Sequence, residues 1–174
     1  MKKTKNANTD TQKRIQRNAE RTLRKVETKL QEPGVKKKKD EFLEKYMICE
    51  TVCKQILIAY KKGTGKEFDP DDIKLHMQEI TAAMKYSAYP FSSDTLKAIF
   101  GSEKKRNSKS CKKLRNGIVH SMDVNDITEV SERYQELTLA MDTFLHTIHN
   151  APATKKEKSR NTGSGRRGTT RRAA

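Results

Sequence analysis

The chain has 174 residues, of which 33% are hydrophobic and 34% are charged, and its formal net charge is +16. This length suits one domain of ordinary size with tails, and the low apolar fraction places part of the chain outside any core. The longest apolar run, residues 56–60, is far too short to cross a bilayer. No apolar stretch follows the lysine-rich start, so neither a membrane span nor a signal peptide is expected.

The positive charge is concentrated at the two ends of the chain. Residues 1–39 contain 14 Lys/Arg against 4 Asp/Glu, and residues 151–174 contain 8 against 1, whereas residues 40–150 have a net charge of −1. Cationic ends are typical of proteins that bind a polyanion, because each neutralised phosphate releases a counterion. A purely solubilising role is the alternative. We therefore divide the chain into a basic arm (1–39), a body (40–150) and a disordered basic tail (151–174).

The arm contains an apolar pattern with helical spacing, which Pro33 and Gly34 end. An amphipathic basic helix of this kind could dock on the body, lie along a phosphate backbone or pair with a second chain. Residues 36–39 are expected to form a linker, after which Asp40 caps a helix that begins at Glu41. The apolar positions of the arm are Ile15, Ala19, Leu23, Val26 and Leu30.

The body shows helical spacing throughout and no segment that alternates with a period of two. The pattern predicts helices over 41–63, from 73 to before Pro90, over 93–100, over 111–119 and from 127 to about 149. The last segment has the clearest periodicity and is expected to be one long helix. We predict an all-α, up-and-down bundle of the four-helix type.

Three cysteines make an odd count in a chain without an export signal, which indicates reduced thiols and a cytoplasmic protein. Cys49 and Cys53 share one helical face with apolar residues. This favours buried packing for them over metal binding. We expect no metal and no other cofactor.

The helix expected at 111–119 carries polar groups able to handle a phosphodiester: Arg115, Asn116 and His120. Histidine transfers protons near neutral pH, and a guanidinium binds two phosphate oxygens while staying charged. Asn116 could orient the phosphate or the imidazole. Residues five apart on a straight helix point about 140° away from each other and lie about 7.5 Å apart along the axis. Convergence therefore needs either a turn loosened by Gly117 or a second copy across a two-fold axis.

The form Arg-Asn-x-x-x-His before the last long helix of a small all-helical domain resembles the signature of the HEPN family. The resemblance covers about residues 40–150. It implies a homodimer that brings two Arg/His motifs into one composite cleft and cuts RNA without a metal, leaving a 2′,3′-cyclic phosphate. It also implies a toxin or phage-defence role, with an antitoxin or another product of the same operon as a further partner.

Some HEPN proteins add a Glu-x-x-x-Lys pair from an early helix. Glu41 with Lys45 and Glu50 with Lys54 both have this spacing, which also stabilises exposed helices. A non-enzymatic nucleic-acid-binding protein, or an adaptor with a HEPN-like bundle, is the rival interpretation. The cations expected to contact RNA are Lys104, Lys105, Arg106, Lys109, Lys112, Lys113, Arg166, Arg167, Arg171 and Arg172.

Overall fold

The computed structural model describes residues 3–65, 67–101 and 108–151, and side chains from Arg14 onward. Within these ranges the chain is helical and contains no β-strand, which confirms the all-α prediction. None of these helices has a segment that is both long and apolar enough to cross a membrane. The helices are α1 (Lys3–Gln31), α2 (Val35–Gly63), α3 (Met77–Tyr86), α4 (Ser93–Phe100), α5 (Cys111–Ser121), α6 (Val124–Glu132) and α7 (Tyr134–His149), with a 3-10 turn at Pro70–Asp72.

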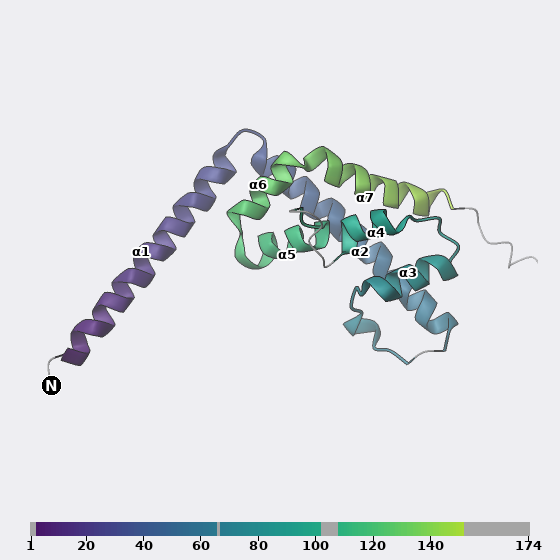
Figure 1. The fold of residues 1–174 in the computed structure, drawn as a ribbon, viewed down its shortest axis with the longest axis horizontal. Helices are drawn as coiled ribbons and strands as arrows, with labels where there is room; N and C mark the ends of the chain where they lie inside the picture. The colour runs from purple at the N-terminus through teal and green to yellow at the C-terminus, as the bar shows by residue number, and fades with distance from the viewer. Residues whose placement is uncertain (1–2, 66, 102–107, 152–174) are drawn as a thin grey trace, which may run out of the picture.

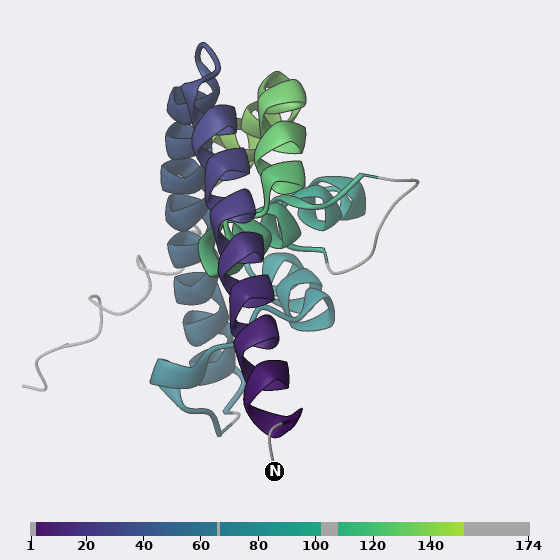
Figure 2. The same cartoon turned by 90° about the vertical axis from the view of Figure 1, so that its left-hand side faces the viewer.

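The first helix projects away from a body formed by α2 to α7 (Figure 1). It meets α2 at a turn where Gly34 adopts a left-handed conformation with a φ of +75°. Seen from its own side, α1 lies between α2 and α6 (Figure 2). Leu30 packs against the core, but Ile15 and Leu23 remain 61% and 57% exposed. The predicted amphipathic helix thus forms, and most of its apolar stripe is uncovered.

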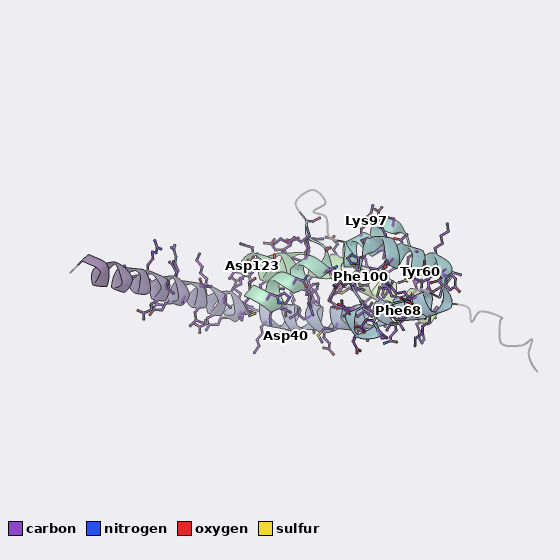
Figure 3. The ribbon with its side chains drawn as sticks, turned by 90° about the horizontal axis from the view of Figure 1, so that it is seen from below. Asp40, Tyr60, Phe68, Lys97, Phe100 and Asp123 are labelled. Atoms are coloured by element: carbon purple, nitrogen blue, oxygen red, sulfur yellow. The ribbon has the colours of Figure 1, made fainter. Side chains whose placement is uncertain are left out.

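The body is organised around α2, whose inner face packs against α3, α5, α6 and α7. Phe42, Tyr46 and Leu57 on this face are almost completely buried. Phe100 of α4 lies within the body (Figure 3) and makes an edge-to-face contact with Phe144 of α7 at 5.4 Å between ring centroids. Burial of each such side chain stabilises the fold by roughly 1.5–3 kcal/mol. One continuous core therefore joins all six helices of the body.

The cysteines belong to this core. Cys49, Cys53 and Cys111 are buried and unpaired, so the predicted packing role of the first two is confirmed. Burial raises the pKa of each thiol to about 12. The thiols are therefore protonated at neutral pH and are poor nucleophiles.

Residues 36–39 do not form a linker, because α2 already begins at Val35. Val35 is only 4% exposed, and the ammonium group of Lys38 donates to the carbonyl oxygen of Ser131 at 3.2 Å. Lys38 also lies over the ring of Tyr134 at 6.0 Å. These tertiary contacts hold the first turn of α2 in place despite its run of lysines.

The long helix expected from residue 127 to 149 is broken at Arg133, which separates α6 from α7. Neither proline nor glycine lies at the break, so the apolar spacing gave no sign of it. Arg133 instead donates to the carbonyl oxygen of Lys109 at 2.9 Å and pairs with Glu136 at 2.8 Å. The break lets α6 pack against α5 and α1, while α7 packs against α2 and α4.

The helix predicted from residue 73 to before Pro90 begins later than expected. Ile73 and Leu75 precede α3, which starts at Met77, yet both side chains are buried. They form a wall of extended chain beside α2 rather than a helical turn. This wall contributes to the cleft described below.

Candidate functional site

Helix α5 carries the Arg-Asn-x-x-x-His motif and is fixed firmly at its start. The hydroxyl of Ser110 accepts a hydrogen bond from the backbone N–H of Lys113 and donates to the carbonyl oxygen of Gly101 at 2.5 Å. Cys111, Leu114 and Ile118 form the buried face of the helix. The opposite face presents one ridge at helical spacing, made of Lys112, Asn116 and His120.

Gly117 allows α6 to approach α5 closely. A Cβ atom at this position would lie 2.8 Å from the carboxyl carbon of Asp126, which is far inside van der Waals contact. The helix is continuous through Gly117, so the turn is not loosened there. Asp126 is buried and pairs with Lys109, and this hydrogen bond raises the pKa of Lys109. The ammonium group of Lys109 is thus used to hold α6 rather than left open to solvent.

Arg115 points toward α2, and few of its donors are used. Its Nη1 donates to Oδ1 of Asn116 at 3.0 Å, and its Nη2 lies 4.0 Å from a carboxylate oxygen of Glu50. The Nε–H group is buried and has no hydrogen-bond partner among the described residues. A guanidinium has five N–H donors, so most of the donor capacity of Arg115 is not used by the fold.

A small cleft of about 240 Å³ opens between α2, α5 and the 73–75 wall. On α2 it contains the ladder Tyr46, Glu50 and Lys54, in which Lys54 pairs with Glu50 at 2.8 Å. Burial, followed by the charge of Glu50, raises the pKa of Tyr46, so the phenol stays neutral. The cleft is lined by Tyr46, Glu50, Lys54, Ile73, Lys74, Leu75, Lys112, Arg115 and Asn116.

Sequence reasoning missed two parts of this cleft. Tyr46 lies one turn before Glu50, so its i, i+4 spacing to the acid was a usable signal. The wall at Leu75 had no such signal, because it is held by a distant contact. Lys112 donates from its ammonium group to the carbonyl oxygen of Leu75 at 2.8 Å.

His120 lies in the last turn of α5 and does not line the cleft. Its side chain is exposed and makes no hydrogen bond or ion pair with the residues that the structure describes. Met122 ends the helix in a left-handed conformation with a φ of +47°, which is strained for a residue with a side chain. Within one chain, the histidine and the guanidinium of Arg115 are therefore separate.

The two Glu-x-x-x-Lys pairs of α2 have different surroundings. Glu41 accepts a hydrogen bond from the hydroxyl of Tyr134, and Lys45 pairs with Asp142 at 2.7 Å. Glu50 and Lys54 instead lie in the cleft beside Arg115. Of the two pairs with equal spacing, the second accompanies the motif.

The remaining predicted cations fall mainly outside the described residues. Lys109 and Lys112 have the structural partners given above, and Lys113 is half-buried on α5. In the described ranges, no group of three or more His, Cys, Asp or Glu side chains is placed to hold a metal ion. Outside those ranges lie Lys104, Lys105, Arg106, Arg166, Arg167, Arg171 and Arg172.

Comparison with known proteins adds no relative. No family model, no curated protein and no solved structure matches the chain. The likeness to HEPN proteins is therefore carried by residues 115–120 and their helical setting alone.

Proposed function

We propose that this protein is a metal-independent endoribonuclease of the HEPN type. RNA carries its own nucleophile, so a base removes the 2′-hydroxyl proton and the 2′-oxygen attacks phosphorus. The bond from phosphorus to the 5′-oxygen breaks, and an acid protonates that oxygen. The products are a 2′,3′-cyclic phosphate and a free 5′-hydroxyl. His120 suits the proton transfers, and Arg115 suits the charge on the crowded phosphate.

The observation that carries the proposal is the unsatisfied guanidinium of Arg115. Among the described residues, it has one hydrogen bond, to Asn116, and a long ion pair to Glu50. An arginine that served only the fold would have its donors satisfied, because each unpaired buried donor costs about 1–3 kcal/mol. Donors left unused beside Asn116 support a role in holding an anion.

A second copy of the chain completes the proposed site. Arg115 and His120 point apart on α5, so one helix cannot place both on one phosphate. Val119, beside His120, is 52% exposed although it is apolar, and exposed Met122 follows. A two-fold contact over this end of α5 would cover these side chains and set two histidines opposite each other, one as base and one as acid. In a cell, such an enzyme would act as a toxin or phage-defence effector restrained by an antitoxin or operon partner.

A non-enzymatic nucleic-acid-binding protein is the second candidate. The observation that favours it is the position of the charge, which lies in the arm and tail rather than around His120. In that case α5 would serve only the packing of the bundle.

Incubation of the protein with end-labelled RNA in EDTA separates the two candidates. The enzyme cuts the RNA despite chelation and leaves cyclic phosphate ends, which acid treatment opens. Binding without cleavage over a range of RNA sequences and protein concentrations would refute the proposed enzyme and leave the binding protein.

A further inference from the structure

An open crevice of about 650 Å³ lies between α1 and the start of α6. Five cations and two acids border it, so its lining has a clear positive excess. Every lining residue except Val124 belongs to α1 or the turn that follows it. The lining consists of Arg17, Glu20, Arg21, Arg24, Lys25, Thr28, Lys29, Glu32 and Val124.

Most of these cations are free to bind a ligand. Lys29 pairs with Glu32 at 2.7 Å. Arg17, Arg21 and Arg24 are exposed, and none of them makes an ion pair within the described part of the chain. From residue 17 to residue 29 the cations recur on every turn, over about 18 Å of helix. A row of this length matches an extended polyanion better than a single small anion.

One side of the crevice, at Val124, follows the proposed catalytic histidine closely in the sequence. Val124 follows His120 by four residues, across the tight turn at Met122 and Asp123. Figure 1 shows this α5–α6 connection on the side of the body that faces α1. Figure 3 places Asp123 at the end of the body nearest α1. The carboxylate of Asp123 accepts a hydrogen bond from the backbone N–H of Asn125, and this hydrogen bond partly offsets the negative charge of the carboxylate.

We propose that α1 is a track for the phosphodiester backbone of RNA and leads it to His120. This inference rests on the proposed ribonuclease function and names the surface that supplies the substrate. Exposed arginines on a straight helix contact phosphates without reading bases, so the track would not select a sequence. It also gives the exposed His120 a ligand, because the strand leaves the crevice at the turn that follows this residue.

Binding is tested apart from cleavage by the use of an RNA that cannot react. Fluorescein-labelled 2′-O-methyl oligouridine lacks the nucleophile, and its anisotropy is titrated at several salt concentrations. The variant is R17Q/R21Q/R24Q, whose glutamines favour helix as much as arginine does. The matched control is K62Q/K85Q/K97Q, which removes three exposed lysines from the body; Lys97 is labelled in Figure 3.

Loss of three phosphate contacts lowers the salt slope by about 2 and the affinity at low salt by on the order of 10²-fold. We expect this for the arm variant and a much smaller change for the control. Equal losses in both variants would overturn the track. A 2′-O-methyl RNA duplex in the same titration shows whether the backbone is taken single- or double-stranded. Absence of cleavage by the parent, with this contrast intact, would refute the ribonuclease and not the binding surface.

The path toward His120 is tested by cross-linking. Val124→Cys introduces a reactive thiol for an azidophenacyl label, while the native thiols are buried and protonated. Leu139→Cys, on an exposed site of α7 outside the crevice, is the control. Cross-links to the oligouridine from position 124 and not from position 139 support the track. Equal or absent cross-linking at the two positions would exclude it.

Discussion

Arg133 and Arg115 are the two arginines in the described part of the body, and their bonding is opposite. Arg133 donates to the carbonyl oxygen of Lys109 and forms ion pairs with Glu129 and Glu136. Arg115 has one hydrogen bond, to Asn116, and a distant carboxylate. Both side chains are similarly shielded, with 21% and 28% exposed.

Arg133 therefore stabilises the fold, whereas the guanidinium of Arg115 keeps donors that could bind a ligand. Arg133 sits at the break between α6 and α7, and its donors join three segments. Arg115 lines a cleft, and most of its N–H groups form no hydrogen bond with the described residues. His120 resembles Arg115 in this respect, because it is placed by α5 and has no hydrogen-bond or ion-pair partner among the described residues. The comparison predicts that function and stability respond to different residues.

The largest expected effect comes from His120→Ala. Loss of the proton-transfer group should lower RNA cleavage by on the order of 10² to 10⁴ in rate. RNA affinity should barely change, because charge-driven binding depends mainly on lysines and arginines, which this variant keeps. The measurements are single-turnover cleavage and anisotropy with the unreactive RNA.

The thermal midpoint of His120→Ala serves as its control. The side chain is exposed and makes no hydrogen bond or ion pair with the described residues, so the midpoint should match the parent's. Full cleavage with an unchanged midpoint would remove His120 from the mechanism. A collapse of the midpoint would show instead that His120 supports the helix and would contradict its placement as a free group.

Arg115→Ala should have the next largest effect, a loss of on the order of 10² to 10³ in cleavage. RNA binding should fall more than in His120→Ala, because a fixed charge leaves the phosphate site. Stability should change little, since the losses are one hydrogen bond and a long ion pair with Glu50, and a buried unpaired N–H disappears with them. If a lower unfolding free energy explained the whole loss of cleavage, Arg115 would be a structural residue like Arg133.

Arg133→Met should show the reverse pattern, with the unfolding free energy lowered by roughly 2 kcal/mol through lost charge-assisted hydrogen bonds. Cleavage per folded molecule should be unchanged. The hydrogen bond with Arg133 lowers the pKa of Glu136, so this part of the stabilisation is present above the ordinary glutamate pKa. It is lost as the pH falls through the lowered value. Urea titrations at neutral and acid pH should therefore show the difference from the parent shrinking in acid.

Helix periodicity was enough to predict the fold class, the packing role of Cys49 and Cys53, and the divergence of Arg115 from His120. It could not predict the break at Arg133, because no proline or glycine marks it and the cause is a set of contacts from the side chain. The start of α2 was missed for a similar reason, since Val35 is buried and Lys38 contacts Ser131 of α6 and Tyr134 of α7. Spacing alone also gave Glu41 and Glu50 equal weight, and only the packing of α5 against α2 distinguishes them.

Gly117→Ala tests the close approach of α6 to the motif helix. Alanine normally stabilises a helix interior by about 1 kcal/mol relative to glycine. Here the added Cβ collides with the carboxyl group of Asp126, and such overpacking costs typically 1–3 kcal/mol. We expect a net loss of about 1 kcal/mol in urea titrations, whereas Leu139→Ala on the exposed face of α7 should be near neutral. A gain for Gly117→Ala would show that α5 and α6 are not packed this tightly.

The smallest expected effect concerns the two acids of α2. Glu50→Gln removes the ion pairs with Arg115 and Lys54. Glu41→Gln also removes one negative charge, here from the side chain that accepts the hydrogen bond of Tyr134. Partly exposed pairs of this kind contribute about 1 kcal/mol or less, so both variants should stay folded. If Glu50 orients the guanidinium, its loss should lower cleavage at saturating RNA by roughly three- to tenfold, because a misplaced group acts less well on the transition state. RNA affinity should rise slightly, since an anion leaves the phosphate site, and this opposite change in rate and affinity is one that a purely structural acid would not produce. Glu41→Gln should leave both unchanged. Identical kinetics for the two variants would mean that the cleft beside Arg115 is not the phosphate site.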